Sequence, residues 1–395
     1  MRIALLTNIL TPYRCSFFDK LHELLKRNNG DFRVYVMTES LPLRPWTFQD
    51  LSRDYTELLN GYKFILGKHE YLYNHSVATR IRAFKPDAII VAGSWTYPTT
   101  WQLMFSQKLK RICPVFFWTE SHNHTGINNK SKSNRFIKWI KQLVLKQFDG
   151  FCVPGKFAKE NILEQINVGN RQFIQLPNLV DNQYYSKTLE MRKNKTALRK
   201  KYQLAPNAFI FFTPARMVEV KGQIPFFSNV SEAVKNKNVT FILAGEGPDK
   251  VRIEDIAKQN NLDVRIYSYQ NQEEIREWLA LTDAFLLPSL SDPNPLSNIE
   301  AAWSGLPLCI SCYVGNGPEL VEDKVNGVVF DTLDKTSVSE KIRFVLNQDN
   351  AWFATAGKLS YQKAENDFEA TKETEKFIEC LEQAVKNFGR GGILG

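Results

Sequence analysis

The sequence has 395 residues, which is too long for one ordinary hydrophobic core and favours two domains. Its 43% hydrophobic and 24% charged residues are typical of a soluble globular protein, and no run of about 18 uncharged apolar residues exists that would span a membrane. The net charge of +9 is uneven, because residues 1–185 carry 25 Lys and Arg against 14 Asp and Glu. We therefore expect an anionic partner for the first half, either an anionic membrane surface or nucleic acid.

Short apolar runs alternate with helical patterns through the first 183 residues. Continuous apolar strands between helices are typical of a parallel sheet that is covered on both faces. The predicted strands are Arg2–Thr7, Phe32–Met37, Asp87–Ala92, Pro114–Trp118 and Gly150–Val153. The predicted helices are Tyr13–Arg27, Trp101–Leu109, Lys132–Gln147 and Lys156–Ile166.

The alternation breaks at Leu-Pro-Asn-Leu-Val-Asp-Asn-Gln, residues 176–183, and then restarts as a second doubly wound unit of similar size. The predicted strands are Phe209–Phe212, Val239–Ala244, Val264–Tyr267 and Ala284–Leu287. The predicted helices are Gln223–Lys235, Pro248–Gln259 and Asn271–Ala280. A last helical pattern, Asn366–Phe388, is expected to cross back to the first domain, before a mobile tail, Gly-Arg-Gly-Gly-Ile-Leu-Gly.

The predicted fold class is therefore α/β, with two Rossmann-like domains that face each other across a cleft. We place the first domain at residues 1–183, the second at 184–365, and the returning helix with its tail at 366–395. Open α/β sheets bind ligands at the carboxyl ends of their strands, so the cleft is the expected site.

The cysteines indicate a reducing compartment and no metal site. Six are scattered through the chain, and only Cys309 and Cys312 form a C-x-x-C pair, inside an apolar run that reads as a buried strand. No second pair completes a zinc site, and no D-x-D motif or histidine cluster suggests another metal. We expect a cytoplasmic protein without metal or cofactor.

Two cations and a Gly-x-Gly turn follow predicted strands of the second domain. Arg216 and Lys221 lie in the loop beyond Phe209–Phe212, where an Arg fork and a Lys point charge can grip a diphosphate. The alternative is a solvated surface loop. Gly245 opens the turn Gly-Glu-Gly, which permits close backbone approach to a ligand and equally suits a plain strand-to-helix turn.

The stretch Ser-Asp-Pro-Asn-Pro-Leu-Ser-Asn-Ile-Glu, residues 291–300, follows the strand Ala284–Leu287. A helix is expected to begin at Leu296–Ser297, and the free N–H groups of its first turn favour an anion. Ser297 and Glu300 also fit the capping box S-x-x-E, in which the glutamate only returns a bond to its own helix start. In the functional alternative, Glu300 accepts bonds from vicinal hydroxyls, and Asp292 faces a similar choice between capping a loop and touching a ligand.

The loop Phe-Phe-Trp-Thr-Glu-Ser-His-Asn-His, residues 116–124, follows a predicted strand end and is expected to face the cleft. Glu120 and His122 are candidates for a catalytic or substrate-binding role there, with His124 behind them. The alternative is that each is a polar residue satisfied within the fold.

Residues 130–146 carry six cations interleaved with Phe136, Trp139, Ile140 and Leu143. This pattern fits either a core-packed helix with a solvated basic face or a basic amphipathic helix that touches a membrane surface. A membrane contact would suit a lipid-linked acceptor at the inner leaflet.

Together these stretches resemble the retaining GT-B glycosyltransferases of family 4, over nearly the whole chain. The resemblance rests on Arg216 and Lys221, Gly-Glu-Gly, Asp-x7-Glu at 292–300 and the following Gly-Leu-Pro, with Thr-Pro-Tyr-Arg at 11–14 and Pro-Asn-Leu-Val-Asp at 177–181. That family usually has Glu-x7-Glu, so Asp292 is one methylene shorter. The loop at residues 8–14 also lacks the Gly-Gly that often approaches the donor phosphate in the family.

The resemblance implies a metal-independent hexosyltransferase that uses a nucleotide diphosphate sugar, with UDP the common carrier in that family. It implies that Glu300 holds the ribose, Asp292 contacts the sugar, and Arg216 and Lys221 neutralise the diphosphate. The residues expected to bind the donor are Arg216, Lys221, Gly245, Tyr267, Asn294, Leu296, Ser297 and Glu300. The expected acceptor is a glycan or lipid-linked molecule in polysaccharide or glycoconjugate synthesis.

Two other functions fit the same architecture. A nucleotide-sugar epimerase would act on the donor alone, and a non-catalytic subunit would bind the nucleotide sugar without turnover. Nucleic-acid binding is the weakest alternative, because the basic residues form no recognised module.

Overall fold

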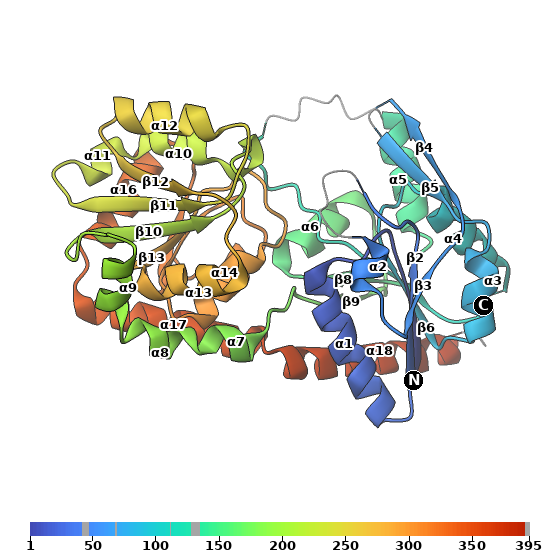
Figure 1. Ribbon diagram of the computed structural model, residues 1–395. Coiled ribbons are helices and arrows are strands. Elements are labelled where there is room, and N and C mark those ends of the chain that lie inside the picture. The colour runs from blue at the N-terminus through green and yellow to red at the C-terminus, as the bar shows by residue number, and fades with distance from the viewer. Residues whose placement is uncertain (42–46, 68, 111, 128–134, 392–395) are drawn as a thin grey trace.

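The computed structural model describes residues 1–41, 47–67, 69–110, 112–127 and 135–391. They form two lobes, each built around a parallel sheet with helices on both faces (Figure 1). The predicted pair of doubly wound α/β units is therefore confirmed. None of the helices in this described part is long and apolar enough to cross a membrane.

The first sheet has seven strands in the order β3-β2-β1-β6-β7-β8-β9. The strands are β1 (Arg2–Thr7), β2 (Asp31–Val36), β3 (Thr56–Leu58), β6 (Ala88–Ala92), β7 (Val115–Trp118), β8 (Gly150–Val153) and β9 (Gln172–Gln175). A separate antiparallel hairpin pairs β4 (Tyr62–Leu66) with β5 (His69–Tyr73). The helices of this lobe are α1 (Pro12–Arg27), α2 (Phe48–Leu51), α3 (Val77–Phe84), α4 (Pro98–Lys110), α5 (Arg135–Leu145) and α6 (Lys156–Gln165).

The second sheet has six strands in the order β12-β11-β10-β13-β14-β15. The strands are β10 (Phe209–Pro214), β11 (Val239–Ala244), β12 (Asp263–Tyr267), β13 (Ala284–Leu287), β14 (Leu308–Ser311) and β15 (Gly327–Phe330). Three short helices lead into it, namely α7 (Asn182–Ser186), α8 (Thr188–Arg192) and α9 (Lys195–Lys201). The remaining helices are the 3₁₀ turn η1 (Glu219–Lys221), α10 (Gln223–Asn229), α11 (Ser231–Val234), α12 (Lys250–Gln259), α13 (Gln272–Leu281), α14 (Leu296–Trp303), α15 (Gly317–Leu320), α16 (Lys335–Leu346), α17 (Asn350–Asp367) and α18 (Ala370–Gly391).

Each sheet separates two hydrophobic cores, because successive side chains of a strand point to opposite faces. In β1, Ile3 and Leu5 join the core beneath α1, whereas Ala4 and Leu6 join the core beneath α3 and α4. This two-sided burial explains why the strands read as continuous apolar runs rather than as alternating ones.

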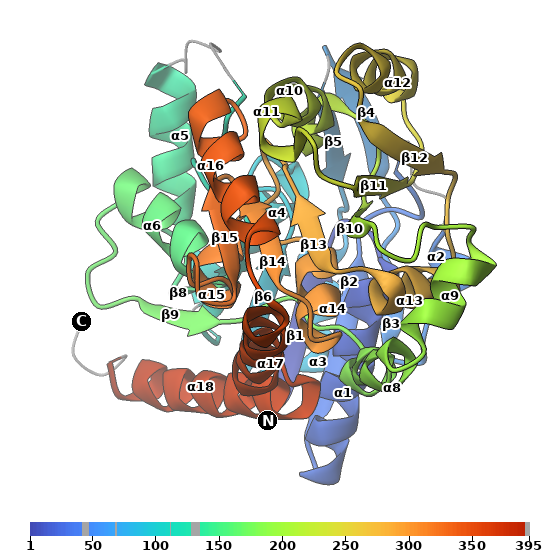
Figure 2. The same ribbon diagram turned by 90° about the vertical axis from the view of Figure 1, so that its left-hand side faces the viewer.

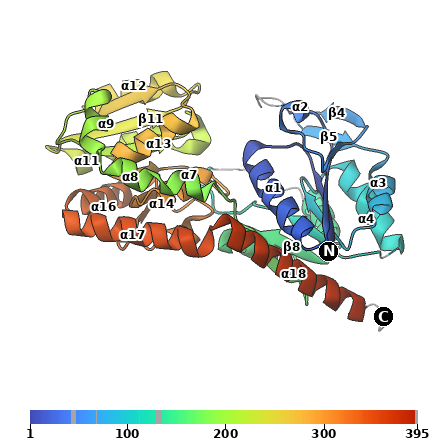
Figure 3. The ribbon, with the colours of Figure 1, turned by 60° about the horizontal axis from the view of Figure 1, so that its bottom comes forward.

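The last helix joins the two lobes physically. Figures 2 and 3 show α17 beneath the second lobe and α18 continuing beneath the first. Phe377 and Leu381 of α18 are fully buried in the core beneath α1. The expected helix Asn366–Phe388 begins later than predicted, because Phe368 inserts into the core of the second lobe and ends α17. Residues 392–395 of the predicted tail lie outside the described residues.

Some elements differ from the sequence prediction. The helix expected at Gln223–Lys235 is interrupted at Val230, giving α10 and α11. The hairpin β4–β5 was not predicted, since all five residues of β4 are exposed and give no alternating pattern. The start of the helix expected at Lys132–Gln147 lies outside the described residues, which resume at Arg135.

Candidate active site

Loops that follow strands of the first sheet are in direct contact with the loop that follows β13 of the second sheet. The Gly126 amide donates to the Leu290 carbonyl (2.8 Å), and Asn178 Nδ2 donates to the Asn294 carbonyl (2.9 Å). The His122 ring Nε2 lies 3.5 Å from the Asp292 carbonyl oxygen. The stretch at residues 289–295 is therefore the meeting point of the lobes, which is where open α/β sheets bind ligands.

Lys221 and Asp292, both predicted site residues, form an ion pair in this region. Lys221 Nζ donates to Asp292 Oδ2 at 2.5 Å, and both side chains are largely buried. Gly222 makes the geometry possible, because its φ of +67° suits glycine and a Cβ there would lie 2.1 Å from the Pro288 carbonyl. The turn after β10 is thereby held against the end of β13.

Arg216 lies in the same turn and is exposed. Its carbonyl accepts a bond from Gln223 Nε2 (3.0 Å), and its guanidinium has no partner among the described residues. Gly245, with φ +148°, packs beneath this turn, because a Cβ would lie 2.5 Å from the Ala215 carbonyl. Gly245 thus positions the backbone that carries Arg216, and the cation remains available to a ligand.

Glu300 does not form the capping box that its spacing suggested. Helix α14 begins at Leu296 with Pro295 as its N-cap, and no side chain caps it, so Ser297 lies inside the first turn. Instead, Glu300 Oε1 accepts a bond from the Tyr185 hydroxyl at 3.0 Å, while Oε2 has no hydrogen-bond partner among the described residues. Burial raises the pKa of Glu300 to about 7, and the Tyr185 bond partly opposes this shift. One carboxylate oxygen is therefore held in place and the other is free to accept.

The other residues predicted to bind the donor are Leu296, Ser297, Asn294 and Tyr267. Leu296 and Ser297 supply the first N–H groups of α14. Asn294 is buried, and both atoms of its side-chain amide lack a hydrogen-bond partner, a condition that usually signals a missing ligand or water. Tyr267 instead packs its ring on Trp278, with centroids 4.5 Å apart.

His122 and Glu120 project from the facing lobe. Burial lowers the pKa of His122, so the ring is neutral at physiological pH, and its buried Nδ1 lacks a partner. Glu120 Oε1 pairs with Arg14 Nη2 (3.4 Å), and the Arg14 guanidinium lies over the Trp118 ring at 4.8 Å. Among the residues that the structure describes, no three His, Cys, Asp or Glu side chains form a group that could hold a metal ion.

A cavity of about 380 Å³ opens beside this pair, and we call it the first-lobe cavity. It is lined by residues that follow β1, β6 and β7, by α5 and α6, and by Pro293 of the second lobe. Glu120 lines it, next to Arg14 and Lys141, which were not predicted as site residues. Arg14 stood in the Thr-Pro-Tyr-Arg motif and Lys141 in the basic segment 130–146, whereas nothing local in the sequence marked the Tyr185 partner of Glu300.

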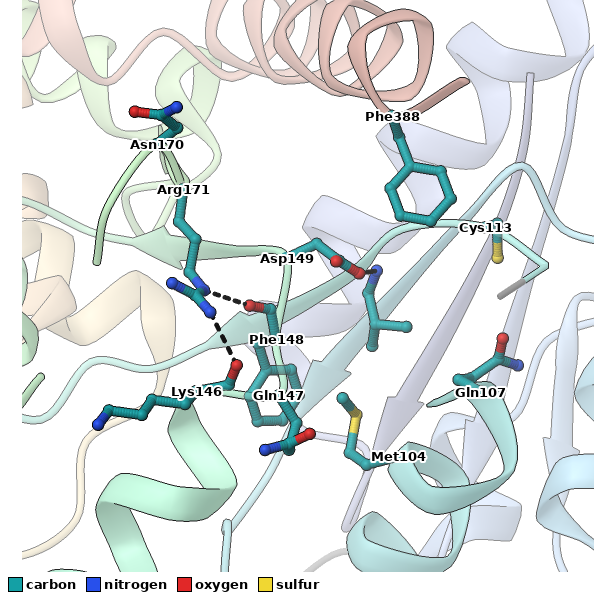
Figure 4. Close-up of a pocket in the computed structure, with 11 residues that line it drawn as sticks. Met104, Gln107, Cys113, Lys146, Gln147, Phe148, Asp149, Asn170, Arg171 and Phe388 are labelled. Carbon is teal, nitrogen blue, oxygen red and sulfur yellow. Dashed lines mark hydrogen bonds between the residues drawn. The ribbon is translucent and has the colours of Figure 1, made fainter. Parts of the chain in front are cut away.

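A second cavity, of about 410 Å³, lies at the opposite end of the first sheet (Figure 4). Arg171 lines it but donates to the carbonyls of Phe148, Lys146 and Val168 at 2.8–3.0 Å, so its guanidinium already has hydrogen-bond acceptors within the fold. Asp149 Oδ2 likewise accepts the Val115 amide (2.8 Å). Although larger, this cavity is remote from the carboxyl ends of the strands, and we do not assign it to substrate.

Comparison with known proteins agrees with this geometry. Residues 194–363 match the family model for glycosyl transferases group 1. EpsF of Bacillus subtilis (strain 168) is 30% identical over 206 residues, which are 51% of this chain and 50% of EpsF. The UDP-Gal:alpha-D-GlcNAc-diphosphoundecaprenol alpha-1,3-galactosyltransferase of Escherichia coli is 24% identical over 276 residues, which are 67% of this chain and 68% of that protein. The chain therefore spans only about half the length of EpsF.

The structural likeness covers more of the chain. The crystal structure of Anabaena HepE in complex with UDP and glucose superposes with a TM-score of 0.70 at 16% identity, over 97% of this chain and 100% of HepE. The chain thus has the GT-B fold, and its residues 194–363 are similar to glycosyl transferases group 1 domains.

Proposed function

We propose that this protein is a glycosyltransferase that moves a sugar from a nucleotide diphosphate sugar to a glycan or lipid-linked acceptor in surface polysaccharide or glycoconjugate synthesis. The observation that carries the proposal is the Lys221–Asp292 ion pair, which joins the segments that follow the neighbouring strands β10 and β13. The same two segments carry the unpaired Arg216 and Glu300, one oxygen of which has no partner among the described residues. Two names support UDP as the nucleotide carrier: that of the Escherichia coli galactosyltransferase, which is similar in sequence, and that of the HepE complex, which is similar in structure.

The donor binds mainly to the second lobe in this proposal. Glu300 Oε2 accepts from the ribose hydroxyls, while Oε1 stays on Tyr185. Arg216, Lys221 and the N-terminus of α14 neutralise the diphosphate. Lys221 keeps Asp292 while it binds phosphate, because an ammonium group has three donors. Asp292 is then placed to accept from a hydroxyl of the donor sugar.

The reaction breaks the bond between the anomeric carbon and a diphosphate oxygen, through an oxocarbenium-like transition state. Negative charge grows on the leaving diphosphate, and preorganised cations stabilise it without a metal ion. We place the enzyme with the retaining transferases of family 4, in which the acceptor hydroxyl attacks from the side of the leaving group. The neutral His122 ring and the Glu120–Arg14 pair face the acceptor side.

We further propose a cytoplasmic enzyme that touches the inner face of the membrane through α5. Phe136, Ile137 and Trp139 are more than half exposed on this helix, which carries no acidic residue. Aromatic and aliphatic side chains next to cations are typical of helices that lie in a bilayer interface. Residues 130–134 of the predicted basic segment lie outside the described residues and carry no part of this argument.

A thermal-shift screen of nucleoside diphosphates and their sugars tests the donor site. A ligand at about 100 times its dissociation constant adds about 2.7 kcal/mol to the free energy of unfolding. We expect UDP and one UDP-sugar to stabilise the wild type and not Glu300→Ala. Donor turnover that depends on an added acceptor supports transfer. Epimerised donor without acceptor supports an epimerase, and binding without turnover of any donor supports a non-catalytic subunit.

A further inference from the structure

The first-lobe cavity holds one positive charge that no described residue balances. Its charged lining residues are Arg14, Glu120 and Lys141, and Glu120 is paired with Arg14 (3.4 Å). Lys141, on α5, is half-buried and makes no hydrogen bond or ion pair with any described residue. Burial without a counter-charge lowers the pKa of this ammonium group. A ligand that brings an anion to Lys141 therefore stabilises the charged form.

The rest of the cavity lining is suited to a sugar ring. Trp95 and Tyr97, which follow β6, are only partly buried, so they offer aromatic surface on which the C–H groups of a sugar can pack. Asn8, Ser94 and Ser121 also line the cavity and carry groups that can bond to sugar hydroxyls. Aromatic surface with a few polar groups is typical of small-molecule sites.

Gln165, on α6, adds an acceptor that has no partner. Its Nε2 donates to the Asn161 carbonyl (2.7 Å) and to Asn161 Oδ1 (2.8 Å), which fixes the orientation of the amide. Its Oε1 is buried and accepts no hydrogen bond from the described residues. A buried acceptor in this condition commonly indicates a ligand or a water molecule, and Gln165 lines the same cavity as Lys141.

The charge of the cavity favours a carboxylate over a phosphate. Because Glu120 offsets Arg14, one unmatched positive charge is left, on Lys141. A carboxylate brings a single negative charge, which matches it. A phosphate monoester carries about 1.5 to 2 negative charges at pH 7, and the excess would lie in the same cavity as Glu120.

We propose that the first-lobe cavity binds an acceptor sugar that carries a carboxylate, with this group beside Lys141 and the hydroxyl that receives the donor sugar toward Pro293. This rests on the proposed function, for which it names the terminal residue of the acceptor as an acidic sugar of the uronic acid class. Pro293 is the part of the second lobe that lines the cavity, and it follows Asp292, the proposed contact of the donor sugar. A neutral acceptor sugar would leave the Lys141 ammonium group without a counter-charge.

NMR titration of the full chain with simple glycosides tests this inference, with excess UDP present so that the donor site is occupied. The probes are methyl glucuronide and methyl galacturonide, each compared with its neutral counterpart, methyl glucoside or methyl galactoside. We expect one uronide to bind the wild type about tenfold more tightly than its neutral counterpart, as a hydrogen bond to a charged group predicts. Lys141→Met, which keeps the apolar stem, should lose this preference and bind the neutral glycoside within about twofold of the wild type.

Two variants separate the charge of Lys141 from a purely structural role. Lys138→Met is the matched control, because Lys138 is exposed on the same helix and does not line the cavity, and it should keep the preference for the uronide. Lys141→Arg keeps the positive charge and should retain most of the preference.

A wild type that binds neither uronide more tightly than its neutral counterpart would overturn the inference, and so would a preference that survives in Lys141→Met. Methyl glucoside 6-phosphate distinguishes the two anions, and tighter binding of this phosphate than of either uronide would overturn the carboxylate. UDP affinity, measured separately without glycosides, should be unchanged in Lys141→Met. Failure of UDP to bind any form would instead count against the proposed function, so the two failures are distinguishable.

Discussion

The Tyr185 hydroxyl donates to Glu300 Oε1 at 3.0 Å, which ties the segment between the lobes to the carboxylate at the carboxyl edge of the second sheet. Tyr185 is itself buried, so its ring fixes the position of the hydroxyl. Glu300 is thereby held in one orientation, and its Oε2 has no hydrogen-bond partner among the described residues. A carboxylate held in this way before the ligand arrives loses less conformational entropy on binding.

Glu300→Gln should stabilise the unliganded protein at pH 8 and not at pH 4. Folding raises the pKa of Glu300 from its usual value to about 7, so the ionised carboxylate destabilises the fold. This cost is absent below the unfolded-state pKa, grows as pH rises, and is complete above the folded-state pKa. With allowance for partial exposure, we expect a gain on the order of 1 to 2 kcal/mol at pH 8, measured by urea unfolding.

The same variant should weaken UDP binding, since an amide has one acceptor oxygen and cannot both accept from Tyr185 and offer an acceptor oxygen to the ribose hydroxyls. Donation by these hydroxyls favours the ionised carboxylate, so UDP should bind the wild type more tightly as pH rises from 6 to 8. Calorimetry in two buffers should show proton release on binding near pH 6.5. Tyr185→Phe serves as the comparison, with a smaller loss of UDP affinity. A UDP affinity that does not change with pH would contradict the role given to Glu300.

Arg216→Ala should lower kcat about 100- to 1,000-fold, the loss typical of one group that stabilises a growing negative charge. The guanidinium is exposed and unpaired among the described residues, so the melting temperature should not change. Arg216→Lys should fall between, because it keeps the charge and loses the planar fork. Arg252→Ala, an exposed arginine on α12, is the control. If Arg216→Ala kept the wild-type kcat, the leaving diphosphate would not be stabilised by Arg216.

Much of the fold was predictable because its strands are buried on both faces. Residues 88–92 are wholly apolar and residues 239–244 are apolar except for Thr240, and the structure places both runs inside their sheets. The hairpin β4–β5 was missed for the opposite reason: its exposed residues carry no burial pattern. The end of α17 depends on Phe368 entering a core that is built from distant strands, which no local pattern reveals.

For the site, the sequence pointed to residues that directly follow predicted strands. It did not point to residues that reach the site from segments far away in the sequence. Lys221 and Asp292 each follow a strand, and the structure pairs them. The helix begins at Leu296, as expected, but the cap that the S-x-x-E spacing of Ser297 and Glu300 suggested does not form, because Pro295 is the N-cap. Tyr185 reaches Glu300 across 115 residues of sequence, and Lys141 enters the first-lobe cavity from α5, so both placements depend on tertiary structure.

Glu319→Ala should loosen the contact between the lobes. Glu319, in α15 of the second lobe, accepts the Lys156 amide (2.7 Å) at the N-terminus of α6 in the first lobe. The helix dipole favours a carboxylate there, and burial raises the pKa of Glu319. We expect a loss of about 1 to 2 kcal/mol in stability and a larger radius of gyration in solution scattering.

A second substitution tests the same contact from the other lobe. A Cβ on Gly155 would lie 2.4 Å from Glu319 Oε1, so Gly155→Ala should displace the carboxylate and reproduce the larger radius. Glu322→Ala, on an exposed neighbour, is the control and should change neither quantity. If both Glu319→Ala and Gly155→Ala kept the wild-type radius, other contacts would be sufficient to hold the lobes together.

Trp139→Glu should abolish binding to vesicles that contain anionic phospholipid. Trp139 is 53% exposed on α5, and its ring lies 5.9 Å from that of Phe136, so the two form one apolar surface beside the cations of the helix. A carboxylate there adds both an unfavourable charge and a polar group at the apolar interface.

Val251→Glu is the matched control, because Val251 is 67% exposed on α12 of the second lobe. Co-sedimentation should be lost for Trp139→Glu, kept for Val251→Glu, and weakened for the wild type by salt, which screens the attraction between the cations and the lipid. Equal sedimentation of the two variants would show that α5 does not make the membrane contact.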